Sequence, residues 1–153
     1  MNKKWMLFLM TIFISLSAAT QEQGYRARVT FSDIKPNFPE HMLKYLGKTI
    51  DVFNLRINGK IFYVSNGISN SIPFDFVKSI DILTTWQDGF VVNLILKTGR
   101  NLANFKCKIS ENIKLSTYEN DEVLGGQREV SIDARLYYHI KKIDFALGEE
   151  GTK

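Results

Sequence analysis

Apolar and polar side chains alternate along this chain, and the alternation limits the folds that it can adopt. Every second residue from 25 to 31 is apolar, and the residues between them are arginine or threonine. Successive side chains of a β-strand point to opposite faces of the sheet, so a period of two predicts a strand with one buried face and one solvated face. Similar strand-like runs follow almost to the end of the chain, which predicts an all-β fold.

Pairs of turn-forming residues separate these runs. Asn58-Gly59 is the strongest hairpin signal, because both residue types accept a positive φ, and it is predicted to join strands 50–57 and 60–65. The spacing favours a small antiparallel meander, closed into a barrel or stacked as a sandwich, over a parallel sheet. Further turns are expected at Asn66-Gly67, Asp88-Gly89 and Thr98-Gly99, with strands at 77–86, 90–97, 100–110, 113–118, 130–134 and 140–147 and a polar loop at 119–127.

One short helix is expected after the first strand. Asn37 is suited to cap it, Pro39 to occupy its first turn, and Gly47 to end it. An internal duplication is a further hypothesis, because residues 77–82 and 140–145 share the pattern apolar-Lys-x-Ile-Asp-apolar. The alternative is that any two strands of a meander resemble each other over six residues.

Several segments also resemble Sm-like RNA-binding barrels. Residues 42–60 combine a short helix, a strand and the Asn58-Gly59 turn, and residues 94–100, 112–115 and 132–135 are similar to later parts of that pattern. Ala134 stands where those barrels have a glycine. The resemblance implies a small, strongly bent SH3-like or Sm-like barrel. RNA binding is not expected, because the chain begins with an export signal.

Residues 1–19 have the three parts of a secretory signal peptide. A basic start at Lys3 and Lys4 precedes an apolar run at 5–16, and small residues stand at Ser17 and Ala19. The apolar run is too short to span a bilayer, so we expect cleavage and no transmembrane anchor afterwards. Residues 20–153 would then form a single all-β domain in the periplasm or outside the cell.

The sequence carries no recognisable catalytic or metal-binding pattern. The two histidines, His41 and His139, have no ligand-type neighbour at helical spacing, and no glycine-rich phosphate loop or serine elbow is present. Acidic residues 119–122 lack the register of a calcium loop and are predicted to be solvated. Cys107 is the only cysteine and is expected to be buried on a strand face with Ala103, Phe105 and Ile109. We therefore expect no catalytic residue, no metal and no cofactor.

Three aromatic residues are the candidate binding site. Trp86 precedes a turn, and Tyr137 and Tyr138 precede the last strand, so all three are predicted to lie near loops. Aromatic side chains near loops anchor partner proteins or stack on sugar rings. The alternative is that they close the ends of a barrel.

These features together predict an exported protein that is not an enzyme. It is expected to bind or support an envelope protein partner within a bacterial assembly, through strand edges or loop aromatics. A small-molecule or glycan-binding barrel, with Trp86 and Tyr137 at its mouth, is the alternative. An enzyme that works through loop carboxylates is the least favoured hypothesis. Export argues against a nucleic-acid partner, and the oligomeric state is left open.

Overall fold

The computed structural model describes residues 24–57, 60–65, 68–109 and 111–145. Strands make up most of this part of the chain, and helix is limited to three short 3-10 turns, so the predicted all-β class is confirmed. The strands are β1 Gly24–Phe31, β2 Thr49–Arg56, β3 Lys60–Ser65, β4 Ile68–Pro73, β5 Val77–Trp86, β6 Gly89–Leu96, β7 Asn101–Cys107, β8 Asn112–Asn120, β9 Gln127–Arg135 and β10 Ile140–Asp144, and the 3-10 turns are η1 Lys35–Asn37, η2 Glu40–Tyr45 and η3 Phe74–Phe76.

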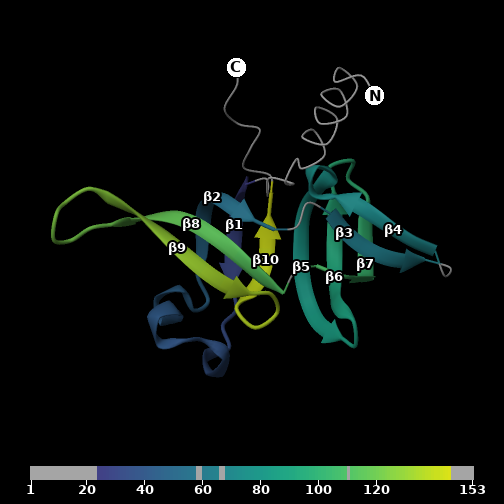
Figure 1. Cartoon of the computed structure of the whole chain (residues 1–153), viewed down its shortest axis with the longest axis horizontal. Coiled ribbons are helices and arrows are strands. Elements are labelled where there is room, and N and C mark those ends of the chain that lie inside the picture. Colours follow the sequence, from purple (N-terminus) through teal and green to yellow (C-terminus); the bar gives the residue numbers. More distant parts are fainter. Residues whose placement is uncertain (1–23, 58–59, 66–67, 110, 146–153) are drawn as a thin grey trace, which may run out of the picture.

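Eight of the strands form one antiparallel sheet in the order β7-β6-β5-β10-β1-β2-β8-β9. The strands β3 and β4 form a separate hairpin, which contacts the large sheet through β7. Within the described residues β7 and β9 stand at opposite ends of the order, so strand pairing does not close this sheet into a barrel. Figure 1 shows β1, β2 and β8–β10 in one half of the molecule and β3–β7 in the other.

The meander is only partial. The runs β5-β6-β7 and β8-β9 follow chain order, but the last strand, β10, lies between β1 and β5. The two motif copies at 77–82 and 140–145 are therefore neighbours, with Ile80 opposite Ile143 and Asp81 opposite Lys142. Their duplication stays a prediction, because adjacency in a sheet does not require common descent.

The prediction that Asn58-Gly59 closes a hairpin is wrong. Strand β2 pairs with β1 and β8, whereas β3 pairs with β4. Ser65 of β3 lies opposite Ile68 of β4, so the hairpin joins β3 to β4 and not β2 to β3. Both dipeptides lie outside the described residues. The hairpins at Asp88-Gly89 and Thr98-Gly99 are confirmed by the pairing of β5 with β6 and of β6 with β7.

The expected helix is replaced by two 3-10 turns, η1 and η2. Asn37 ends η1 and caps no helix, while Pro39 immediately precedes η2. Gly47 follows η2 with a φ of 66°, which glycine adopts at no steric cost. The polar loop expected at 119–127 is also shorter than predicted, because β8 continues to Asn120 and β9 begins at Gln127.

Buried apolar side chains form one continuous core. On one side Phe31 stacks on Tyr45 of η2, with ring centroids 5.2 Å apart. On the other side Phe74 of η3 packs against Phe145 at 5.8 Å and against Tyr25 at 6.0 Å. Aromatic side chains from the 3-10 turns therefore fill the core along with those of the strands. In the part of the chain that the structure describes, none of the helical turns has the length and apolar character needed to cross a membrane.

Candidate interaction surface

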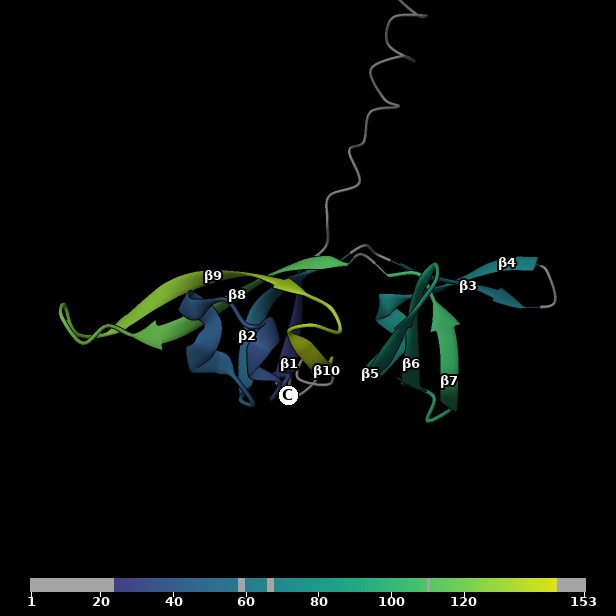
Figure 2. The same ribbon diagram turned by 90° about the horizontal axis from the view of Figure 1, so that it is seen from below.

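The hairpin β8-β9 projects beyond the rest of the sheet. Its two strands pair without a shift from Asn112 opposite Arg135 to Asn120 opposite Gln127. Strand β2 supports only the first half of β8, because its pairing with β8 covers residues 54–56 and 114–116. Residues 118–129, which we call the arm, therefore continue past the neighbouring strand. Figures 1 and 2 show the arm extending outward from the half that contains β1, β2 and β10, on the side away from β5–β7.

Hydrogen bonds hold the turn at the end of the arm. The Asp121 carboxylate accepts from the backbone N–H of Leu124 at 3.0 Å and of Val123 at 2.9 Å, and these two bonds lower the pKa of Asp121. Gly125 donates its N–H to the Asp121 carbonyl at 3.0 Å. Gly125 and Gly126 have φ values of 71° and 87°, a region that favours glycine. The sequence thus encodes a defined turn.

The same turn exposes two aliphatic side chains. Val123 is 91% exposed and Leu124 is 86% exposed. Isolated apolar residues are common on protein surfaces, but adjacent and almost fully exposed aliphatic residues on a projecting, ordered turn are typical of contact sites. Sequence reasoning treated 119–127 as a polar loop and missed them. The signal was present as an apolar pair flanked by acidic residues and glycines.

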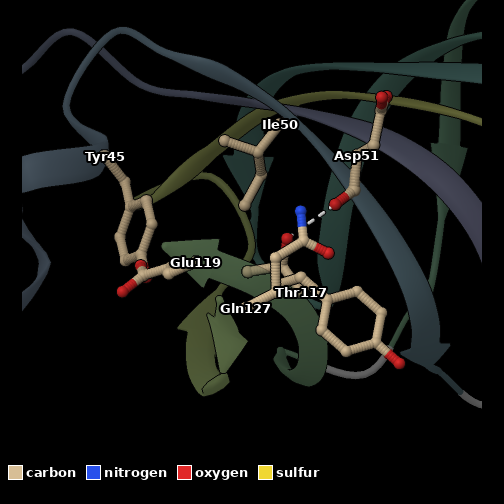
Figure 3. Close-up of a pocket in the computed structure, with 7 residues that line it drawn as sticks. Tyr45, Ile50, Asp51, Thr117, Glu119 and Gln127 are labelled. Carbon is tan, nitrogen blue, oxygen red and sulfur yellow. Dashed lines mark hydrogen bonds between the residues drawn. The ribbon is translucent and has the colours of Figure 1, made fainter. Parts of the chain in front are cut away.

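A groove of about 370 Å³ lies at the base of the arm, between η2, β2, β8 and β9. Its wall is partly aromatic and partly polar. Figure 3 shows Tyr45 and Glu119 meeting at one side of the groove. The lining residues are Tyr45, Ile50, Asp51, Thr117, Tyr118, Glu119 and Gln127.

Polar contacts brace the base of the arm against η2 and β2. The Glu119 carboxylate accepts a hydrogen bond from the Tyr45 hydroxyl and pairs with Lys44 Nζ at 2.7 Å. Partial burial tends to raise the pKa of Glu119, but the bonds from Lys44 and Tyr45 outweigh burial, and the pKa is lowered. Thr117 donates its hydroxyl to the Asp51 carbonyl at 2.7 Å. The arm is thus anchored at its base.

The two edges of the large sheet differ. The β7 edge is irregular, because its register with β6 shifts and Asn104 has a φ of 53°, with its N–H bonded to the Asn93 side chain at 2.9 Å. Strand β3 also contacts β7. The β9 edge has no proline and pairs regularly with β8 throughout its length. Bulges and covering segments block edge-to-edge pairing. The β9 edge is also covered at its end, because His139 bonds both the backbone N–H and the carbonyl of Arg135.

The predicted binding residues lie at one end of the sheet, away from the groove lining. Trp86 ends β5 and the tyrosines precede β10, which is the antiparallel neighbour of β5. Trp86 donates its Nε1–H to the Cys107 carbonyl at 3.5 Å, and Lys106 Nζ lies 5.5 Å from its ring centroid. Tyr137 and Tyr138 contact each other edge to face at 5.5 Å, and both are more than one-third exposed. Their role in binding stays a prediction.

His139 and Cys107 are both buried in the interior of the protein. His139 Nδ1 accepts from the Arg135 backbone N–H at 3.1 Å, so Nε2 carries the proton and donates to the Asn37 carbonyl at 2.7 Å. The ring is buried, and both nitrogen atoms are satisfied. Cys107 is fully buried, as predicted, and burial raises the pKa of its thiol to about 12. Ala103 is exposed, however, because the irregularity at Asn104 turns it away from the face that buries Cys107.

The acidic segment 119–122 does not gather around one point. Glu119 turns to η2, and Asp121 holds the turn of the arm. Among the described residues no group of three or more histidine, cysteine, aspartate or glutamate side chains is placed to hold a metal ion.

The chain was compared with models of protein families, with curated proteins and with solved structures. None of the three comparisons finds a match.

Proposed function

We propose that the protein is an exported binding protein, without catalytic activity, that acts by protein–protein interaction in a bacterial envelope assembly. The exposed pair Val123 and Leu124 at the end of the arm carries this proposal. Export rests on the signal peptide pattern at 1–19, which lies outside the described residues. The contact surface that we propose is the arm, in addition to the loop aromatics that the sequence indicated.

The structure of the arm supports this function in two ways. Burying two aliphatic side chains from water in a partner's pocket contributes about 2–3 kcal/mol per side chain. The turn is already ordered by the Asp121 bonds and by the two glycines, so little conformational entropy is lost on binding. A pre-ordered apolar projection is therefore suited to insertion into a complementary pocket.

The test is a pull-down from envelope extract with the wild-type chain and the double variant Val123→Ser, Leu124→Ser. We expect the variant to lose a captured protein that the wild type retains, with affinity lowered at least about tenfold. The matched control is Ile34→Ser, which changes an aliphatic residue that is 55% exposed and lies outside the arm.

Denaturation midpoints of all three proteins should agree, because the changed side chains are largely exposed. Equal capture by the double variant and the wild type would contradict the proposal, and so would an extract in which the wild type captures nothing above the resin background.

The groove at the base of the arm favours a second candidate, a small-molecule or glycan-binding function. Tyr45 and Tyr118 supply aromatic surface, and Gln127 and Asp51 supply polar groups. The groove is built from residues other than Trp86 and Tyr137, which the sequence placed at the mouth. Saturable binding of an oligosaccharide that is lost in Tyr118→Ala would support this candidate, and no binding across a glycan panel would count against it.

A further inference from the structure

Two contacts limit the length of the groove at the base of the arm. The Thr117 hydroxyl bonds to the Asp51 carbonyl at 2.7 Å and ties β8 to β2. The Tyr45 hydroxyl and Lys44 Nζ hold the Glu119 carboxylate and tie β8 to η2. These ties lie only two residues apart along β8, and Figure 3 shows both of them at the groove. The groove therefore suits a compact occupant better than a strand threaded between β2 and β8.

The charged groups of the groove are engaged with the chain itself. Glu119 is held as described, and the other lining carboxylate, that of Asp51, accepts a hydrogen bond from Arg28 Nε at 3.0 Å. The remaining wall includes Ile50 and the ring of Tyr118, which is 56% exposed and stacks on Phe53 with ring centroids 4.5 Å apart. A fixed aromatic wall beside engaged polar groups favours an occupant with apolar side chains.

The chain carries a matching occupant at the tip of its own arm. Val123 and Leu124 are adjacent and almost fully exposed, and the bonds of Asp121 order the turn that presents them. Their exposure shows that they do not fill the groove of their own copy. We propose that two copies of this chain associate, with Val123 and Leu124 of each copy in the groove of the other.

A two-fold axis across the arms allows both contacts to form together. When the two arms lie side by side and antiparallel, the tip of each arm meets the base of the other. The distance from tip to groove is the same in both copies, so an arm of any length satisfies both contacts. Such an interface uses the same surface on both subunits and closes at two copies. Figures 1 and 2 show no other strand beside the tip of the arm.

The charges near the two surfaces are complementary. Asp121 and Glu122 immediately precede the apolar pair at the tip. Lys48 lies between two lining residues in the sequence, donates its backbone N–H to the Tyr45 carbonyl at 2.9 Å and is exposed. Because the carboxylates of the groove are already paired with cations, an acidic tip approaches a surface with an exposed lysine at its side.

This inference rests on the proposed function, because it uses the same tip of the arm and names a second copy of the chain as a partner. The interface buries four aliphatic side chains in total, which places it in the class of small, concentration-dependent interfaces. In the dimer both tips are covered, so another protein must compete with the second copy for them.

The test is disulfide cross-linking between two variants of the purified chain. Leu124→Cys places a thiol at the tip, and Ile50→Cys places one in the groove. The native Cys107 is fully buried and does not compete. An equimolar mixture of the two variants should form a disulfide-linked dimer under mild oxidation, whereas Leu124→Cys alone should not, because the two tips lie at opposite ends of the paired arms.

The matched control is Ile34→Cys, which exposes a thiol outside the arm and the groove. Its mixture with Leu124→Cys should give no dimer above the background. Circular dichroism and denaturation midpoints check that the variants fold. If Ile50→Cys fails to fold, Tyr118→Cys supplies a groove thiol at a more exposed position.

Sedimentation equilibrium tests the dimer without a cross-link. The wild type should dimerise with increasing concentration, and the double variant Val123→Ser, Leu124→Ser should do so at least about tenfold more weakly. The double variant Ile50→Cys, Leu124→Cys should end as a dimer with two disulfides when it is oxidised. A ladder of larger products would overturn the two-fold arrangement.

Two further outcomes would overturn the dimer. One is a wild type that stays monomeric up to about millimolar concentration, even if its groove binds an oligosaccharide. The other is equal cross-linking of Leu124→Cys with the groove variant and with Ile34→Cys. Capture of an envelope protein is tested separately in the pull-down, where mass spectrometry distinguishes that protein from a native copy of this chain. A monomer that still captures such a protein through its tip overturns the dimer alone, and a cross-linked dimer without such capture overturns the envelope partner alone.

Discussion

His139 connects the end of β9 to η1, and replacing it should change both the stability of the fold and its dependence on pH. The substitution His139→Phe keeps a ring beside Phe38, whose centroid lies 5.3 Å from that of His139. It removes the bond from the Arg135 N–H and the bond to the Asn37 carbonyl. Each bond contributes about 1 kcal/mol, so the free energy of unfolding should fall by about 2 kcal/mol.

The sign of the pH effect follows from the pKa of His139. Burial lowers it below the usual value of 6.5, nearby Arg135 and His41 lower it further, and the bond to the Asn37 carbonyl opposes these effects. Protonation of Nδ1 would also replace the acceptor of the Arg135 N–H with a donor. The unfolded chain therefore binds the proton more readily. The stability that neutral His139 provides is fully present above about pH 6.5 and is lost as the pH falls through the folded pKa.

Urea denaturation of the wild type between pH 8 and pH 5.5 measures this effect. One titrating group limits the slope to about 1.4 kcal/mol per pH unit. His139→Phe should remove most of the slope in this range, while His41→Gln, which changes the other histidine, should leave most of it. Two results would refute the assignment of this pH dependence to His139. In one, the stability of the wild type stays constant or rises on acidification; in the other, His139→Phe leaves the slope unchanged.

Three further outcomes are expected. Cys107→Ala should lower the free energy of unfolding by about 1 kcal/mol, because it leaves a small cavity. The native Cys107 thiol should react slowly with thiol reagents, because burial raises its pKa. Rapid labelling of the native protein would contradict its buried position. Gly89→Ala should lower the free energy of unfolding by more than about 2 kcal/mol, since the new methyl group would clash with the Cys107 carbonyl. An unchanged urea midpoint would count against this close approach. Glu119→Gln should lower the free energy of unfolding by about 1 kcal/mol or less, but it should speed amide hydrogen exchange at the base of the arm. Unchanged exchange there would show that the bonds from Tyr45 and Lys44 to Glu119 do not hold the arm in place.

Local patterns in the sequence were sufficient to predict the strands but not their partners. The alternation at 25–31 identified β1, and Asp88-Gly89 identified the β5-β6 hairpin, because these signals depend only on neighbouring residues. The position of β10 between β1 and β5 depends on contacts between residues far apart in the chain. The Asn58-Gly59 signal failed for the same reason, since β2 finds its partners in β1 and β8.

The candidate surface was harder to predict than the fold. The local signal at Val123 and Leu124 indicates a turn, but their projection beyond the sheet also depends on where β2 stops pairing with β8, and that pairing joins residues far apart in the chain. Phe38 and Phe74 are buried although they lie outside the strands, so strand alternation could not assign them to the core. Cys107 was assigned correctly because its own strand buries it against β6.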